Sequence, residues 1–140
     1  MHEILIEKTL NASVDQVWSV LSDFGNLDWY PPAERVEVLG EGPGQIRRIY
    51  MMGMDTPVDE KLEAIDETAR QFSYTIPDMP MQDYRVVVNV NEDRDAKCHV
   101  RWHARFSGVG EGMKAEDMIA LMTDTYGAMM DDIERAAASR

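Results

Sequence analysis

A change in hydrophobic period is the feature that most constrains the fold of this chain. Between residues 35 and 107 apolar and polar side chains alternate in short segments, whereas from residue 118 to 133 apolar side chains recur every three or four positions. The first pattern is typical of strands with one buried face, and the second of an amphipathic helix. The sequence therefore predicts a run of strands followed by one long helix.

Short segments rich in Gly, Pro or Asp separate the expected strands, for example at 40–44, 53–57 and 77–80. Tight links between consecutive strands favour an antiparallel meander. One more strand is expected at the N-terminus. The seven expected strands are 2–10, 35–39, 45–52, 58–66, 70–76, 84–91 and 97–107.

Helix signals follow the first strand. Ser13 and Gln16 have the spacing of a capping box, in which each side chain satisfies a free backbone N–H group of the other residue. Gly25 is suited to ending this helix, and a second helical turn is expected over 26–30, before Pro31. We therefore expect one α+β domain over residues 1–140, in which a curved seven-stranded antiparallel sheet grips a long C-terminal helix, with two short helices after the first strand.

Charge and cysteine content restrict the partners and the compartment. The formal net charge is -12 over 140 residues. Such a surface repels phosphate backbones and anionic lipid heads, so we expect neither nucleic acid nor membrane partners. Cys98 is the only cysteine, and no apolar run resembles a signal peptide or a membrane span. The sequence thus predicts a cytoplasmic protein, and it does not predict the oligomeric state.

A sheet of seven strands is wider than one helix can cover, so the sheet must curl around the helix. Its inward side chains then pack together as core or leave a hollow for a guest, and both outcomes stay open. Strand alternation indicates which side chains point inward. The expected inward residues are Tyr50, Met52, Glu60, Leu62, Phe72, Tyr74, Tyr84, Val86, Val88, Trp102, Ala104 and Phe106.

Methionine is unusually frequent, with 11 residues. Met52 and Met54 lie at one expected turn and Met79 and Met81 at another, and a meander places both turns at the same edge of the sheet. Because methionine is flexible and polarizable, it is common at binding surfaces that adapt to their ligand. Loose filling of the core is the alternative, and these loops could also contact a protein partner.

Several segments resemble the SRPBCC group of the START-like superfamily, in particular its polyketide cyclase/dehydrase and lipid-transport branch. These segments are 11–25, 27–31, 40–44, 60–67 and 83–85. The resemblance extends over nearly the whole chain. It implies the helix-grip fold, with an internal cavity between the sheet and the C-terminal helix.

Within that superfamily the layout is similar to that of the plant abscisic acid receptors, whose pocket is closed by a gate loop and a latch loop. Residues 52–55 match the gate in position and residues 78–81 match the latch. The receptors anchor a ligand carboxylate with a lysine, but the matching segment here is 33–35, so an acidic ligand requires Arg35 or Arg48 to turn inward. By position, the resemblance implies a pocket lined by Tyr50, Glu60, Phe72, Tyr84, Val86, Met118, Met122 and Tyr126.

Metal and cofactor sites are not expected. His99 and His103 would lie about 13 Å apart on a strand, too far to share one ion. Nothing in the sequence specifically supplies Cys98 with the base that a nucleophile requires. The glycines at 40, 42 and 44 precede a strand, so they do not form a dinucleotide-binding loop.

Catalysis by Glu60 is an alternative to simple binding. An inward carboxylate could transfer protons, and Tyr84 and Tyr126 could stabilise an enolate. Glu60 could instead pair with Arg48 on the adjacent strand or point to solvent.

The sequence therefore favours binding of a small hydrophobic molecule that is lipid-, polyketide- or hormone-like. A polyketide cyclase, aromatase or dehydratase and a protein-interaction module are the alternatives. The expected ligand-binding residues are Tyr50, Met52, Met54, Glu60, Leu62, Phe72, Tyr74, Met79, Met81, Tyr84, Val86, Trp102, Met118, Met122 and Tyr126.

Overall fold

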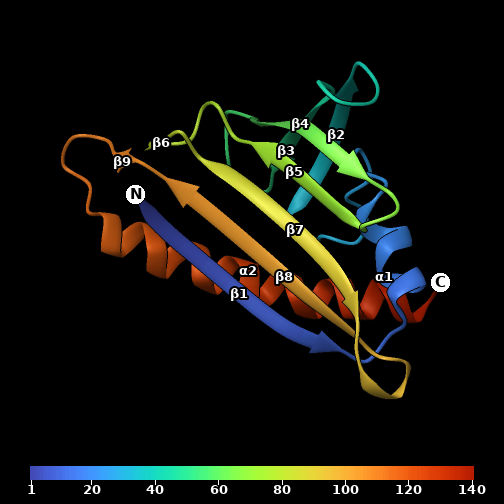
Figure 1. The fold of residues 1–140 in the computed structure, drawn as a ribbon. Coiled ribbons are helices and arrows are strands. Elements are labelled where there is room, and N and C mark those ends of the chain that lie inside the picture. Colours follow the sequence, from blue (N-terminus) through green and yellow to red (C-terminus); the bar gives the residue numbers. More distant parts are fainter.

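A computed structural model describes all 140 residues. The chain runs from strand to helix, through the meander, to a long terminal helix (Figure 1). The elements are β1 (His2–Leu10), α1 (Val14–Leu21), β2 (Ala33–Leu39), β3 (Ile46–Met51), β4 (Val58–Asp66), β5 (Gln71–Thr75), β6 (Met81–Gln82), β7 (Arg85–Glu92), a 3₁₀ turn (Arg94–Ala96), β8 (Cys98–Phe106), β9 (Gly108–Val109) and α2 (Ala115–Ala138).

Seven strands form one antiparallel sheet in the order β1-β8-β7-β5-β4-β3-β2. The meander from β2 to β8 is confirmed, and β1 joins it by pairing with β8 over its whole length, from His2 opposite Phe106 to Leu10 opposite Cys98. The short β6 and β9 form a separate two-stranded ribbon, which the sequence did not predict. This ribbon ties the β5–β7 connection to the segment that leads into α2.

Helix α1 begins where the capping box predicts. The Ser13 hydroxyl accepts from the Gln16 N–H, and the Gln16 side chain accepts from the Ser13 N–H. The expected second helix over 26–30 is wrong, because these residues form turns rather than a helix. The chain between α1 and β2 has only about eleven residues, and turns bring it to the sheet edge without a further helix.

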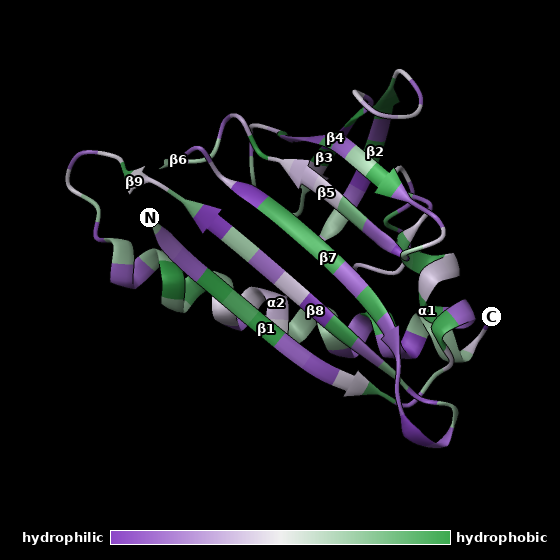
Figure 2. Ribbon diagram, in the orientation of Figure 1, coloured by the Kyte–Doolittle hydropathy of each residue, from purple (hydrophilic) through white to green (hydrophobic).

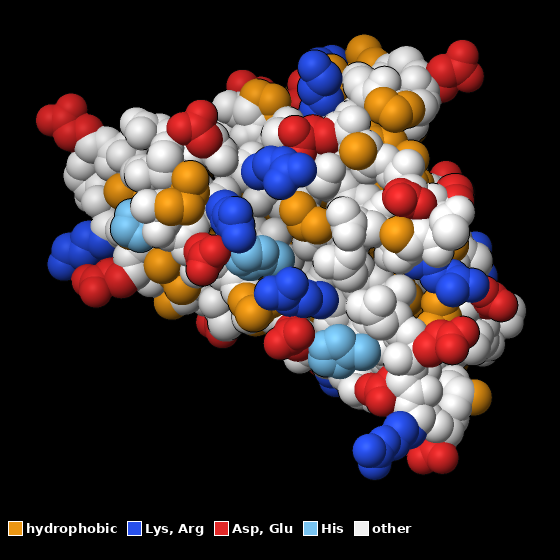
Figure 3. Space-filling model, viewed as in Figure 1, with side chains coloured by type: hydrophobic (Ala, Val, Ile, Leu, Met, Phe, Trp, Pro, Cys, Tyr) orange, Lys and Arg blue, Asp and Glu red, His pale blue; other side chains and the backbone are white.

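Helix α2 crosses the concave side of the sheet, behind β1 and β8 in the view of Figure 1, and the sheet curves so that β2 at its other edge lies farther from the viewer. The convex side faces solvent. Along β8 hydrophobic and hydrophilic residues alternate (Figure 2), and side chains of Lys, Arg, Asp, Glu and His are spread over this outer face (Figure 3). The core therefore lies between the sheet, α1 and α2.

The hydropathy of the helices sets one further limit on the architecture. Neither helix combines the length and the apolar content needed to span a lipid bilayer.

Candidate functional site

A cavity of about 330 Å³ lies between the concave side of the sheet and the first half of α2. Fourteen of the 18 residues around it are hydrophobic. Apolar walls with a few polar groups are usual for small-molecule sites. The lining consists of Leu27, Tyr30, Arg47, Ile49, Met51, Met54, Val58, Glu60, Tyr74, Ile76, Met79, Pro80, Met118, Leu121, Met122, Thr125, Tyr126 and Met129.

Helix α2 supplies one wall through a stripe that repeats every three or four residues. Met118, Met122 and Tyr126 were expected in this wall, and the structure places all three there. Leu121, Thr125 and Met129 complete the stripe and were not in the predicted set. The helical spacing could have predicted them, because Leu121 and Thr125 follow Met118 by three and seven residues, Met129 follows Tyr126 by three, and such spacings place side chains on one face of a helix.

Two loops bound the cavity at one edge of the sheet. Met54 belongs to the β3–β4 turn, and Met79 and Pro80 belong to the β5–β7 connection. The meander therefore brings these two turns together at the same edge, as expected. Met52 does not line the cavity and is 65% exposed, and Met81 is buried in β6, where it pairs with Val109.

The polar part of the cavity wall is an ion pair between β3 and β4. Arg47 and Glu60 face each other in register, and Arg47 Nε and Nη2 lie 2.8 and 2.6 Å from Glu60 Oε1. Arg47 Nη1 donates to the Phe24 carbonyl oxygen at 2.9 Å. The guanidinium also lies over the Phe24 ring, 3.9 Å from its centroid. Each nitrogen of the guanidinium thus has a partner within the protein.

Tyrosines surround the deep end of the cavity. Tyr126 lines it, and its hydroxyl is hydrogen-bonded to that of Tyr84, which lies behind it in the core. Burial raises the pKa of Tyr74 and of Tyr126 well above the usual value, and the charge of Glu60 raises both further. These side chains are therefore neutral hydrogen-bonding groups at physiological pH.

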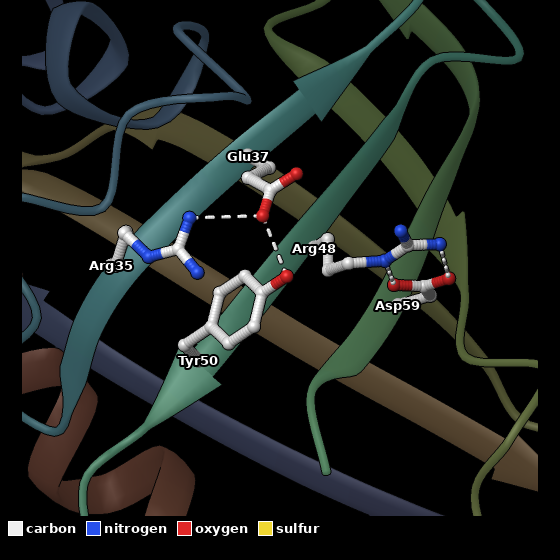
Figure 4. Close-up of polar contacts among 5 residues, drawn as sticks. All are labelled: Arg35, Glu37, Arg48, Tyr50 and Asp59. Atoms are coloured by element: carbon white, nitrogen blue, oxygen red, sulfur yellow. Dashed lines mark hydrogen bonds and ion pairs between the residues drawn. The ribbon is translucent and has the colours of Figure 1, made fainter.

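The expectation that Tyr50 and Met52 point inward is wrong. Tyr50 lies on the outer face of β3, where its hydroxyl donates to Glu37 at 2.6 Å and Arg35 stacks on its ring (Figure 4). Arg48 pairs with Asp59 on the same outer face. Neither arginine that was considered as an anchor for an acidic ligand turns inward.

The wrong prediction for β3 comes from an error of one residue in its register with β4. Glu60 was considered as a partner of Arg48, but the structure pairs it with Arg47. Residues directly opposite in an antiparallel pair share a face, and a slip of one residue moves every side chain to the other face. Arg47 and Ile49 were therefore missed, although an inward Glu60 opposite Arg47 would have predicted both.

Several other residues expected in the pocket are packed in the core instead. Trp102, for example, lies edge-on to Phe72 and Tyr74 and is 1% exposed, with an Nε1 that has no hydrogen-bond partner. Leu62, Phe72, Val86 and Trp102 belong to β4, β5, β7 and β8 of the main sheet, whereas Met81 lies in β6 and Tyr84 directly before β7. The expected residues that are buried without lining the cavity are Leu62, Phe72, Met81, Tyr84, Val86 and Trp102.

The cavity does bring together seven of the expected residues from five parts of the chain. Their role in binding stays a prediction, since the geometry describes only where they lie. The seven are Met54, Glu60, Tyr74, Met79, Met118, Met122 and Tyr126.

The histidines and the cysteine lie away from the cavity. His99 and His103 are on the outer side of β8, where they contact Glu7 and Glu3 of β1 at 3.2 and 3.3 Å. Cys98 is fully buried, and burial raises the pKa of its thiol to about 11. A thiol with so high a pKa is a poor nucleophile at neutral pH.

Comparison with known proteins agrees with this architecture. Residues 1–138 match the model of the family described as polyketide cyclase/dehydrase and lipid transport. No curated protein matches the sequence.

Solved structures share the fold at low sequence identity. XoxI from Bacillus cereus has a TM-score of 0.86 at 22% identity, over 99% of this chain and 96% of that one. A protein from Thermobifida fusca has a TM-score of 0.85 at 24% identity, over 99% and 95%. Ara h 8.0201 has a TM-score of 0.79 at 17% identity, over 99% of both chains.

The match to the family model covers nearly the whole chain, and the sheet and long helix form the expected helix-grip fold. Family and fold together indicate a domain of the kind that binds hydrophobic ligands. The chain belongs to the polyketide cyclase/dehydrase and lipid transport family.

Proposed function

We propose that this protein binds a small hydrophobic molecule in the cavity between the sheet and α2. The observation that carries the proposal is the cavity itself, with its 14 hydrophobic residues among 18 around a volume of about 330 Å³. Six methionines lie in this lining and give it walls that can adapt to the shape of a guest. Ligand binding would bury apolar surface on both partners, at roughly 25 cal/mol per Å² before the entropic cost of association.

The entrance supports the same proposal. Met54 and Leu121 line the cavity and are each 55% exposed, so apolar side chains reach from the interior to the surface between the β3–β4 turn and α2. An apolar ligand would cover them. We further propose that the protein acts in the cytoplasm as a carrier or sensor, where the lone thiol of Cys98 stays reduced.

Thermal unfolding in the presence of a library of lipophilic compounds tests the proposal. A ligand that binds the folded state raises the melting temperature, and Met122→Asp should abolish the rise by placing a charge in the cavity wall. Leu5→Asp is the matched control, because Leu5 is an exposed apolar residue of β1 that does not line the cavity. The proposal fails if no compound raises the melting temperature, or if both variants respond as the unmodified protein does.

Catalysis of a cyclase or dehydratase type is the second candidate, favoured by one observation. Glu60 lines the cavity, and so does the hydroxyl-bearing Tyr126. A carboxylate and a neutral hydroxyl in an apolar site could transfer a proton and stabilise an enolate. Turnover of a polyketide-like substrate that falls at least about a hundredfold in Glu60→Gln would support it. Unchanged turnover would exclude this mechanism.

A further inference from the structure

The charges of the cavity wall are confined to one pair. Among the 18 lining residues only Arg47 and Glu60 carry a formal charge, and they neutralise each other. Arg47 is enclosed, with a side chain that is 5% exposed and nitrogens that bind Glu60 and the Phe24 carbonyl oxygen. Arg47 thus uses three of its five N–H groups within the protein, and Glu60 already neutralises its charge, so it offers an anionic ligand no unpaired positive charge.

Glu60 is different, because the pair uses only one of its oxygens. Both contacts from Arg47 are to Oε1, and no protein group donates to Oε2. An acceptor at the wall of an apolar cavity loses free energy when a ligand displaces water from it without replacing the hydrogen bond. A guest that covers Oε2 is therefore favoured when it brings a donor to that oxygen.

We propose that the ligand is uncharged, with an apolar body and a hydroxyl group that donates to Glu60 Oε2, and that the cavity discriminates against carboxylates. This inference rests on the proposed function, since it specifies the ligand class of the same cavity. A ligand carboxylate would either be repelled by Glu60 or displace it from Arg47, which leaves a carboxylate unpaired in an apolar wall.

The surrounding tyrosines agree with this. Tyr30, Tyr74 and Tyr126 line the cavity, and burial is the main cause that raises their pKa values. The charge of Glu60 raises all three further, and at Tyr74 the charge of Arg47 opposes it. A ligand anion would be disfavoured for the same reasons as a tyrosinate, first because it loses its hydration in the apolar cavity and second because Glu60 is negatively charged. A ligand cation would lose its hydration at a pair that is already neutral, so a neutral hydroxyl is favoured over either charged group.

Three probes of nearly equal shape separate these alternatives: naphthalene-2-methanol, 2-methylnaphthalene and 2-naphthoate. The cavity volume is at the lower end of the range for ligand pockets, so a bicyclic probe is suitable. Affinities measured by isothermal titration calorimetry should place the alcohol about tenfold above the hydrocarbon, with the carboxylate weakest. If the carboxylate binds as tightly as the alcohol, the inference is wrong.

Two variants test the role of Glu60. Glu60→Gln retains a side-chain oxygen for Arg47 but removes the negative charge, so binding of 2-naphthoate should strengthen by about tenfold while the hydrocarbon is unaffected. Arg47→Met/Glu60→Leu removes both charges and leaves no buried charge unpaired. The affinities of this double variant for naphthalene-2-methanol and for 2-methylnaphthalene should differ by no more than about twofold. Circular dichroism confirms the fold of each variant.

The results distinguish this inference from the proposed function. If no probe binds, or if Met122→Asp leaves the binding intact, the cavity is not the site and both proposals fail. If the probes bind in the cavity without preference for the alcohol, or if the preference survives in Arg47→Met/Glu60→Leu, only the hydroxyl recognition by Glu60 is rejected.

Discussion

The two halves of α2 differ although they belong to one continuous helix. In the second half Met130, Ile133 and Ala137 are buried to 1% or less, while no residue between 115 and 125 is buried. The second half packs against α1 as well as β1, and the first half faces the cavity. The difference teaches that one continuous helix both completes the packed core and forms a wall of the cavity.

Polar contacts also join the second half of α2 to β1 and to the residue that follows it. Lys8 of β1 donates to Asp131 at 2.6 Å, and the Asn11 N–H donates to Glu134 at 2.7 Å. These contacts are exposed and each contributes little to stability. They nevertheless hold the second half of α2 to the strand that enters α1, and the first half has no such contact to β1.

The comparison predicts that the largest loss of stability follows when a buried apolar side chain in the second half of α2 is shortened. Ile133→Ala should lower the free energy of unfolding by about 2–5 kcal/mol, because Ile133 is fully buried and the cavity left behind cannot close. Met122→Ala should cost less than about 1 kcal/mol, since its side chain already borders empty space. Urea unfolding measures both. Equal losses would show that the two halves are packed alike.

The next prediction concerns the charged part of the cavity wall, where the expected loss lies within the range given for Ile133→Ala. Arg47→Met should cost about 3 kcal/mol, because Glu60 is left without its partner. Adding Glu60→Leu should recover most of that loss, since no unpaired charge remains. Equal stability of the single and double variants in urea would show that the pair does not contribute as a unit.

Gly25, in the turn that follows α1, lies against Val38 of β2. A Cβ at position 25 would lie 2.6 Å from Val38 Cγ2, so Gly25→Ala forces one of them to move. We expect a loss of about 1–3 kcal/mol in thermal unfolding. The double variant Gly25→Ala/Val38→Ala makes room and should restore part of the stability. No rescue would mean that Gly25 is required for another reason.

The smallest expected change in stability concerns the N-terminus of α2. Lys114 is the N-cap residue, with extended backbone angles of -117° and 133°, but its side chain makes no capping bond. Lys114→Ser should stabilise the cavity half of α2 by about 1 kcal/mol. Hydrogen exchange should then slow at residues 115–125 and stay unchanged near Ile133. Uniform slowing along α2 would show that the two halves unfold together.

The sequence predicted most of the fold because local patterns specify it. The boundaries of β1 and β4 agree with the structure, and the capping box at Ser13 located α1. The expectation of two short helices failed at 26–30, where Pro31 and the short distance to β2 leave room only for turns.

The candidate site was predicted less completely, since it depends on register and on packing between distant elements. Along β3 the apolar Ile46 and Ile49 are three residues apart, so the alternation was compatible with either face. The pairing of Arg47 with Glu60 removes that ambiguity. Burial alone also did not separate Phe72 and Trp102, which pack in the core, from Tyr74, which lines the cavity.

By itself, the sequence determined the order of the seven sheet strands and of the long helix, the family, and the apolar stripe of α2. These properties depend on spacing along the chain, which covalent geometry converts directly into faces of strands and helices. Only the tertiary structure decided that Arg47 faces inward and that the hollow lies beneath the first half of α2. Both depend on how segments far apart in the chain meet, which periodicity within one segment does not specify.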